Sequence, residues 1–590
     1  MSALRVTSAL TALLLLCSAC TASRSATQPD SENLNPAQVA LRAFVDAHFE
    51  DQFRRNPGYA TRVGIHTYDA ELRGFTAQER IENLAQLKAQ LAALPQQVDR
   101  NALPPLDQAD YDILENELRG GILEIEVVRN WERNPNAYLV IASGSVFQLI
   151  NRDFAPLEER MRSAIGRMKR VPDVFAEAQA TLKNPPKLWT EIAISQANGT
   201  RTLYAQTLPQ AFAPVKDAAL QEQFKQEQAR CLAAIDGYIR FMKEQLLPRS
   251  NGDFAIGEAV YRQKLQYDEG VTEDIDSLLA WGRAELKRTQ AQFQEVAARI
   301  TPGKAPMDVY RDLGKEHPTP AELVPTTRQA LEQIRQFLID KRIITVPSQV
   351  RALVEETPVF NRALSFASMS IPGPFEPRAT EAYYYVTPPD PAWSPEQVAQ
   401  HMSFYNRYAL EVVSIHEAYP GHYVQFLWTN KVKSKVRRLM GSGSFSEGWG
   451  LYTEQMMLDE GYGAGPDADK FRLNQLALYL QRLARYVVGL SLHTRGMTYE
   501  QAVSFFEQEA YMTRTNAERE ARRGTSDPTY LVYALGKKMI LELREEARAK
   551  WGKDFTLQRF HDEVVSYGYP PLPILRRLMF AEPPIPAASR

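Results

Sequence analysis

The spacing of apolar residues predicts a mainly α-helical protein with one small β-sheet. In seven segments, apolar residues recur three and four positions apart with charged residues between them, as in amphipathic helices. These segments are 37–53, 77–94, 107–131, 156–169, 218–247, 272–300 and 320–344. Strand-like patterns are few and short, at 253–256, 352–357 and 381–387.

The segment 381–387 is the clearest predicted strand, because it is dense in tyrosine. It is followed by Pro388 and Pro389. Since proline cannot donate a ladder hydrogen bond, we expect a short edge strand.

Charge and length limit the classes of partner. The 590 residues include 69 basic and 71 acidic side chains, a net charge of −2. Nucleic-acid binding needs a concentrated basic surface, so we expect no nucleic-acid partner. The length permits more than one domain, but we find neither a repeat nor a linker after residue 36. We therefore predict a single helical domain over 37–590.

The first 19 residues are typical of a cleaved export signal. Arg5 precedes the apolar run 6–16, which is too short to span a bilayer. Small residues directly before Cys20 resemble a bacterial lipobox, in which that cysteine becomes the lipidated first residue of the mature chain. Cys17 stands where the lipobox prefers leucine, and an ordinary signal peptide is the alternative.

The predicted mature N-terminus is a tether. Residues 20–36 are rich in small polar residues and proline and have little to bury, so we expect a flexible segment. With Thr21 after the lipobox cysteine, the resemblance favours an outer-membrane anchor on the periplasmic side. The membrane would be contacted through the lipidated N-terminus only.

The segment 405–430 carries the candidate chemistry. It is apolar except for a few residues that include His416, Glu417 and His422. Burying a carboxylate costs about 1–5 kcal/mol of folding free energy unless the group is paired or faces a metal. The familiar zinc motif H-E-x-x-H places two histidines one helical turn apart. Here the spacing is H-E-x-x-x-x-H, and six residues turn a regular helix by about 240°.

Pro420 and Gly421 change this geometry. Proline lacks the N–H that would bond the carbonyl of His416, so the helix must open. A two-residue bulge at the Pro-Gly pair would return His422 to the face of His416. The alternative is a kinked core helix whose two histidines are hydrogen-bonded.

A second segment, 441–457, supplies candidate acids. Glu447 and Glu454 lie seven residues apart, two turns along one face of a predicted helix. Glu447 can complete a His-His-Glu zinc site, with a fourth position left for water. We expect Glu454 and Tyr452 to lie around the ligands, with Glu454 orienting a histidine. The alternative is that both acids are solvated.

These motifs resemble a bacterial family known as domain of unknown function 885. Members of that family resemble zinc metallopeptidases of the gluzincin type. Their helical architecture is similar to that of angiotensin-converting enzyme and the thermostable carboxypeptidases. The similarity spans nearly the whole mature chain and includes the following residues: His416, Glu417, Pro420, Gly421, His422, Gln425, Glu447, Gly448, Trp449, Leu451, Tyr452, Glu454, Arg485, Leu492, His493, Tyr533, Gly536, Phe560, His561 and Asp562.

The resemblance implies that His416, His422 and Glu447 bind one Zn²⁺ per chain and that Glu417 is the general base. Two positions depart from the family pattern: Gly489 replaces an Asp, and Tyr423 replaces a frequent second His.

The implied reaction is metal-assisted hydrolysis, in which Glu417 takes a proton from water and returns it to the leaving amine. An added donor should stabilise the oxyanion, and Tyr533 is the first candidate and His493 the second. Each has an ordinary structural role as its alternative. Arg522 and Arg523, in a predicted polar loop, would bind a substrate carboxylate or simply be solvated.

The predicted strand 381–386 would offer its backbone edge to an extended peptide, or be only a buried hairpin. Together these features predict an exported, membrane-tethered zinc peptidase that hydrolyses short peptides. The main alternative is a non-catalytic envelope lipoprotein with a binding or assembly role that keeps the fold. A third reading is an amidase or esterase with the same metal chemistry. Glu417 favours an enzyme, because a scaffold has no need of a buried carboxylate beside two histidines.

Overall fold

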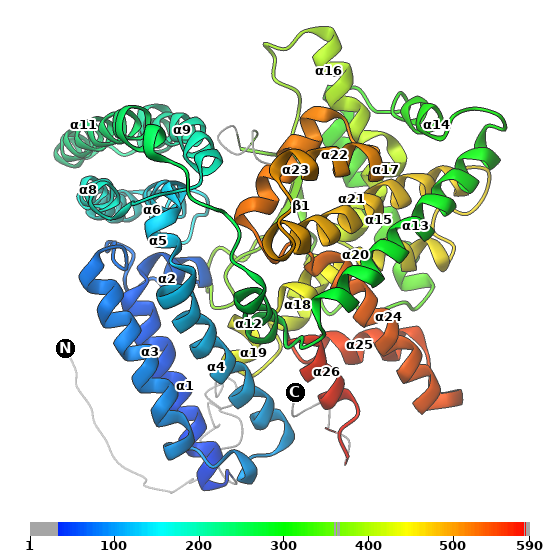
Figure 1. The fold of residues 1–590 in the computed structure, drawn as a ribbon, viewed down its shortest axis with the longest axis horizontal. Helices are drawn as coiled ribbons and strands as arrows, with labels where there is room; N and C mark the ends of the chain where they lie inside the picture. The colour runs from blue at the N-terminus through cyan, green and yellow to red at the C-terminus, as the bar shows by residue number, and fades with distance from the viewer. Residues whose placement is uncertain (1–33, 359–361, 363–365, 583–584, 586–590) are drawn as a thin grey trace, which may run out of the picture.

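A computed structural model describes residues 34–358, 362, 366–582 and 585 (Figure 1). The chain is mainly α-helical with one small sheet, which confirms the predicted fold class. The predicted signal peptide and Cys20 lie outside the described residues.

The helices before the sheet are α1 (Pro36–Arg55), α2 (Pro57–Val63), α3 (Ala77–Gln97), α4 (Pro105–Leu123), α5 (Asn130–Arg133), α6 (Pro135–Phe147), α7 (Leu157–Met168), α8 (Val171–Thr181), α9 (Lys187–Thr202), α10 (Leu208–Phe212), α11 (Ala218–Phe241), α12 (Glu258–Glu269), α13 (Ile275–Ile300), α14 (Pro306–Leu313) and α15 (Leu323–Asp340). Those after it are α16 (Pro395–Met402), α17 (Arg407–Glu417), α18 (His422–Thr429), α19 (Lys435–Leu439), α20 (Gly443–Asp459), α21 (Ala468–Thr494), α22 (Tyr499–Glu509), α23 (Arg514–Ser526), α24 (Val532–Trp551), α25 (Leu557–Val565) and α26 (Leu572–Met579).

Local capping signals set several of these helix starts. The side chain of Asn35 accepts a hydrogen bond from the backbone of Gln38, and the side chain of Gln38 bonds back to the backbone of Asn35. Asn35 also donates to the carbonyl of Ala102 at 2.8 Å. Asn35 and Pro36, the last two residues of the predicted tether 20–36, therefore already belong to the fold.

The sheet corrects two predictions. Its strands are β1 (Leu353–Glu356), β2 (Ala367–Ser370) and β3 (Tyr383–Val386), in the order β1-β3-β2. β3 pairs in parallel with β1 and antiparallel with β2, so it is the central strand rather than an edge strand. The proline pair follows the end of β3 and interrupts no ladder bond. The predicted strand at 253–256 is an irregular segment before α12.

Buried apolar side chains form two clusters. The smaller lies mainly among α6 to α11 and includes Tyr204 and Tyr238. The larger joins α1 and α4 to α12 and α13, the sheet and the C-terminal helices. In Figure 1, α8, α9 and α11 lie together to one side of α13 and α17 to α24. The single domain predicted for 37–590 stays a prediction.

The central pair of helices is α20 with α24, which cross almost backbone to backbone. A Cβ added at Gly448 of α20 would lie 2.4 Å from the Cα of Gly536 of α24. Glycine at both positions is therefore what allows the close crossing. It brings Tyr533 and Lys537 of α24 near the acids of α20.

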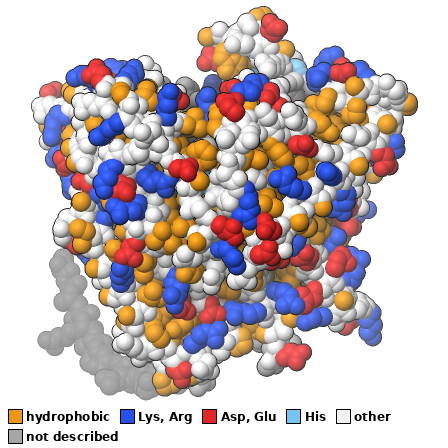
Figure 2. All heavy atoms as spheres, viewed as in Figure 1, with side chains coloured by type: hydrophobic (Ala, Val, Ile, Leu, Met, Phe, Trp, Pro, Cys, Tyr) orange, Lys and Arg blue, Asp and Glu red, His pale blue; other side chains and the backbone are white. Residues whose placement is uncertain are grey.

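The molecular surface carries mixed charges. Figure 2 shows lysine and arginine interspersed with aspartate and glutamate over one face, in keeping with the net charge of −2. None of the helices in the described ranges combines the length and the apolar character needed to cross a bilayer.

Candidate metal centre

The helix that carries the two histidines is interrupted between them. α17 ends at Glu417 and α18 begins at His422. Across the break, the N–H of Gly421 donates to the carbonyl of Ile415 at 3.0 Å, six residues back instead of the four of a regular helix. The carbonyl of Pro420 accepts a hydrogen bond from the indole of Trp449 at 2.9 Å. The predicted opening at the Pro-Gly pair is therefore present.

Two glycines make room for His416. A Cβ at Gly421 would lie 1.7 Å from the carbonyl oxygen of His416, and one at Gly450 of α20 would lie 2.6 Å from its ring carbon Cε1. Gly421 has a φ of −64°. Glycine is required at this position because of the close approach, not because of a left-handed backbone.

The break brings His416, His422 and Glu447 together. The Nε2 atoms of His416 and His422 lie 3.5 and 3.6 Å from the same oxygen, Oε2 of Glu447. The candidate ligand atoms of the three residues all lie within 4.8 Å of one another. The side chains of His422 and Glu447 are 19% and 30% exposed, so the group is open to solvent on one side. Three donors with an open side are typical of catalytic zinc sites.

Glu454 lies on the far side of His416, where it was expected. Its Oε1 is 2.8 Å from Nδ1 of that ring. This contact holds the other ring nitrogen, Nε2, toward Glu447. Seven residues on a helix are within about 20° of two full turns, which is why Glu447 and Glu454 can both contact one ring.

Tyr452 does not join this group. Its hydroxyl contacts Nε2 of His561 at 2.7 Å, and Arg544 lies 3.5 Å away. Five residues beyond Glu447 on α20, Tyr452 is rotated by about 140° from it. The described contacts of the Tyr452 hydroxyl therefore do not bring it to the candidate ligands.

The carboxylates make the site favourable for positive charge. Burial lowers the pKa of His416, but its hydrogen bonds to Glu447 and Glu454 outweigh this and raise the pKa to about 10. Burial raises the pKa of Glu447, yet the two histidines hold that pKa well below its usual range. Two imidazoles and a carboxylate, in surroundings that carry negative charge, are a donor set that fits a divalent zinc ion.

Glu417 directly follows His416 and is the last residue of α17. Its Oε2 accepts a hydrogen bond from the backbone N–H of Met369 in β2 at 3.0 Å. Glu417 also lines a cavity of about 370 Å³. The strand next to Glu417 is thus β2, whereas β3, which was expected to offer a free edge to a peptide, is paired on both sides.

Of the two predicted oxyanion donors, Tyr533 is near the cluster. It is 9% exposed. Burial raises the pKa of Tyr533, and the negative charge of Glu447 raises it further. The guanidinium groups of Arg485 and Arg523 lie 5.1 and 5.8 Å from its ring centroid.

His493 lies elsewhere, on α21. Its Nε2 contacts the carbonyl of Gly524 at 2.8 Å, and its ring packs near Phe254 and Tyr261. Burial lowers the pKa of His493 to about 4. Eight residues separate it from Arg485, about 12 Å along the helix. Its described contacts include none of the three candidate ligands, so the structure does not bring this donor to the site.

Lys537 of α24 was not found by sequence reasoning. It is 1% exposed, its Nζ has no hydrogen-bond partner among the described residues, and it lies 3.3 Å from the ring centroid of Tyr479. Burial lowers the pKa of Lys537 to about 7, although Glu454 and Glu285 act in the opposite direction. The one sequence signal is a lysine directly after Gly536, where α24 crosses α20.

The two arginines predicted in a loop belong to helix α23 instead. Arg523 lines the 370 Å³ cavity together with Glu417, whereas Arg522 is exposed and is not among the residues that line it. The pair is therefore split, because neighbours on a helix point about 100° apart.

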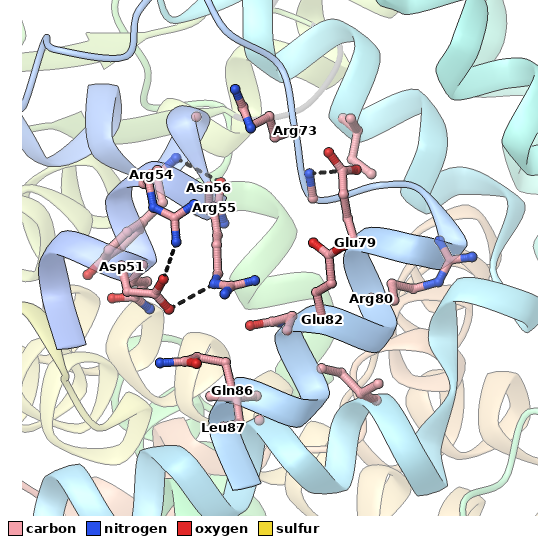
Figure 3. Close-up of a pocket in the computed structure, with 18 of the residues that line it drawn as sticks. Asp51, Arg54, Arg55, Asn56, Arg73, Glu79, Arg80, Glu82, Gln86 and Leu87 are labelled. Atoms are coloured by element: carbon pink, nitrogen blue, oxygen red, sulfur yellow. Dashed lines mark hydrogen bonds and ion pairs between the residues drawn. The ribbon is translucent and has the colours of Figure 1, made fainter. Parts of the chain in front are cut away.

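A larger cavity, about 600 Å³, lies among helices α1 to α4 and α6. Figure 3 shows Asp51 facing Arg54 and Arg55, with ion pairs of 2.6 and 2.8 Å, across from Glu79 and Glu82. None of the described residues that line it is a predicted site residue. Size alone therefore does not locate the candidate chemistry.

The fold and site define a mainly helical protein with a His-His-Glu group and, directly after its first histidine, a glutamate that lines a cavity. A family described as "Bacterial protein of unknown function (DUF885)" matches residues 57–579, so the chain belongs to this family. This confirms the family inferred from the motifs. The resemblance to gluzincins stays a prediction.

Two solved structures share this fold. One, described as "a putative lipoprotein of unknown function from Shewanella oneidensis", has 30% sequence identity and a TM-score of 0.78, and the match covers 93% of this chain and 100% of that one. The other, described as "the putative lipoprotein from Colwellia psychrerythraea", has 18% identity and a TM-score of 0.77, with 92% and 98% covered. Among curated proteins, no match is found.

Proposed function

We propose that this protein is an exported, membrane-anchored lipoprotein and a zinc-dependent peptidase that acts on short peptides. The observation that carries the proposal is the convergence of His416, His422 and Glu447 across a break in the helix, with Glu417 directly after His416. If the helix were broken only to accommodate Pro420, no carboxylate would be needed between the two histidines.

His416, His422 and Glu447 are the residues that would hold the metal. Zinc in such a site acts as a Lewis acid and lowers the pKa of a water molecule in contact with it. Glu454 would fix the orientation of His416 through the 2.8 Å contact to Nδ1.

Glu417 is the residue we assign to proton transfer. The N–H of Met369 holds one of its oxygens, which orients the carboxylate beside the cavity. From there it would take a proton from the attacking water and deliver it to the leaving amine. The Tyr533 hydroxyl, kept protonated by burial and by Glu447, would donate to the oxyanion.

Substrate size and location follow from two further observations. A cavity of about 370 Å³ is at the low end of small-molecule sites, about 300–1,000 Å³, which favours short peptides over folded proteins. The lipobox-like residues before Cys20, and the descriptions of the two structural neighbours as putative lipoproteins, support export and lipidation. Thr21 supports the outer membrane as the anchoring site.

The test is hydrolysis of a peptide library by the zinc-loaded mature protein and by its Glu417→Gln variant. We expect the variant to keep its zinc and to lose hydrolysis by about 10²- to 10⁴-fold, because general-base catalysis is removed. Glu411→Gln, the same substitution on the same helix, is the control and should stay active. Full activity of Glu417→Gln would remove the assigned base. A zinc-loaded wild type that cuts no peptide would instead support the non-catalytic envelope role.

A further inference from the structure

We infer that the cavity beside Glu417 recognises the free carboxylate at the C-terminal end of a peptide, so that cleavage takes place near that end. This inference rests on the proposed peptidase function and adds the substrate class to it. It comes from the other side chains that line the cavity together with Glu417.

The cavity is cationic. Its lining holds four arginines and two acids, Glu417 and Glu520, so the lining side chains carry a formal net charge of +2 before Asp527, which pairs with Arg523 from outside the lining, is counted. The arginines are Arg482, Arg485, Arg519 and Arg523. Like charges gathered in a confined space repel one another, and an anionic ligand relieves that repulsion. Guanidinium groups also match a carboxylate with two parallel hydrogen bonds.

Arg485 forms the fixed part of the arginine group. Its Nε and Nη2 donate to the two oxygens of Glu520 at 2.6 and 2.9 Å, and both residues are 8% exposed. Burial raises the pKa of Glu520, but Arg485 outweighs this and lowers that pKa. This ion pair fixes the position of Arg485 in the cavity lining, and Glu520 neutralises the charge of that arginine.

Arg523 is the arginine best suited to a ligand. Its ion-pair partner is Asp527, at 3.1 and 3.2 Å, in a pair whose side chains are 42% and 38% exposed, and it also hydrogen-bonds the side chain of Tyr533. Such an exposed pair contributes little to stability and can yield to a substrate carboxylate. Arg523 and Arg485 both lie against the ring of Tyr533. Tyr533 also interacts electrostatically with Glu447, so it lies between these arginines of the cavity lining, here called the arginine wall, and the candidate metal ligand.

Part of the remaining lining is apolar, beside the polar side chains of Gln481 and Asn516. Phe366 and Phe404 stack with ring centroids 4.2 Å apart, and Leu410, Val413 and Met512 lie in the same cavity. A peptide whose last residue has an apolar side chain would bury that side chain against this wall. The predicted substrate is therefore a peptide with an apolar C-terminal residue and a free carboxylate.

The test compares N-acetyl-alanyl-alanyl-phenylalanine as the free acid with the same peptide as the carboxamide. For the wild type we expect kcat/KM to favour the acid by about tenfold or more, because the carboxamide lacks the negative charge that strengthens hydrogen bonds from guanidinium groups. In Arg523→Gln the ratio of acid to amide should fall toward one. Arg522→Gln, the exposed neighbour outside the cavity, is the matched control and should keep the wild-type ratio.

A binding measurement separates this inference from the proposed function. Calorimetric titration of both peptides into Glu417→Gln protein should show tighter binding of the acid, and Arg523→Gln added to that variant should remove the difference. Equal kcat/KM for acid and amide, or equal ratios in Arg523→Gln and Arg522→Gln, would overturn the carboxylate site while the peptidase proposal stands. Tighter binding of the acid with no cleavage of either peptide by the wild type would contradict the peptidase and support the carboxylate site.

Discussion

His416 and His493 are two buried histidines with opposite surroundings. They are 5% and 1% exposed, so burial does not distinguish them. Each nitrogen of His416 faces a carboxylate, and its pKa is raised to about 10. Within the described part of the chain, His493 has one backbone carbonyl as its partner and its Nδ1 has none, and burial lowers its pKa to about 4. The partners of a histidine, not its burial, indicate what it can do.

A third histidine supports this reading. His561 contacts the carbonyl of Ile343 and the hydroxyl of Tyr452, and burial lowers its pKa to about 4. Like His493, it is a neutral side chain that satisfies polar groups in the core. Neither has the carboxylate that orients a metal-binding histidine.

The largest expected difference between the two kinds of histidine is in zinc binding, and it is tested by replacing one histidine of each kind. His422→Gln should lose its zinc, from one ion per chain to none, because the site would keep only two ligands. His493→Gln, which keeps a donor for the carbonyl of Gly524, should retain one zinc per chain. Elemental analysis of the two purified variants and the wild type checks this. Zinc retained by His422→Gln, or lost from His493→Gln, would reverse our assignment.

Acid stability tests the other side of the comparison. The folded-state pKa of His493 is about 4, below the unfolded value of about 6.5, so the unfolded state binds more protons between these values. Stability should therefore fall as pH drops, by about 2 kcal/mol between pH 7 and pH 5 for this residue. Urea unfolding at both pH values measures the loss, which should be smaller in His493→Gln by that amount. An identical pH dependence in the variant would show that His493 is not held neutral.

The smallest expected effect concerns the carboxylate behind His416. Glu454→Gln should weaken zinc binding by about tenfold, the low end of the range for such partners, because the amide oxygen still accepts a hydrogen bond from Nδ1. Competition with a chromophoric chelator measures the change, and Glu460→Gln, just beyond the end of α20, is the control. Equal zinc affinity in both variants would leave Glu454 with a packing role only.

Much of the candidate site could be predicted because it depends on local rules. Pro420 cannot continue a helix, so the opening between His416 and His422 follows from the chain itself. The spacing of Glu447 and Glu454 places them on one face of any regular helix. The same helix geometry, applied strictly, would have excluded Tyr452 from that face.

Other features could not be predicted, because they depend on which elements meet. The proline pair after β3 says nothing of what lies on either side of the strand, and β3 proved to be central. The arginine wall combines residues of α21 and α23 with Glu417 of α17, which are far apart in the sequence. Periodicity cannot show that Lys537 faces the acids of α20, because that depends on the contact between Gly448 and Gly536.

By itself, the amino-acid sequence determined the helical class, the position of the helix break, and the residue types available to bind a metal. These follow from interactions between residues close in the chain: hydrogen bonds four residues apart, the geometry of proline, and the period of 3.6. Only the tertiary structure decided that Glu447 faces both histidines, that His493 lies elsewhere, and that a cationic cavity adjoins Glu417. Those outcomes depend on how helices distant in sequence pack against one another, which the free energy of burying their apolar faces determines.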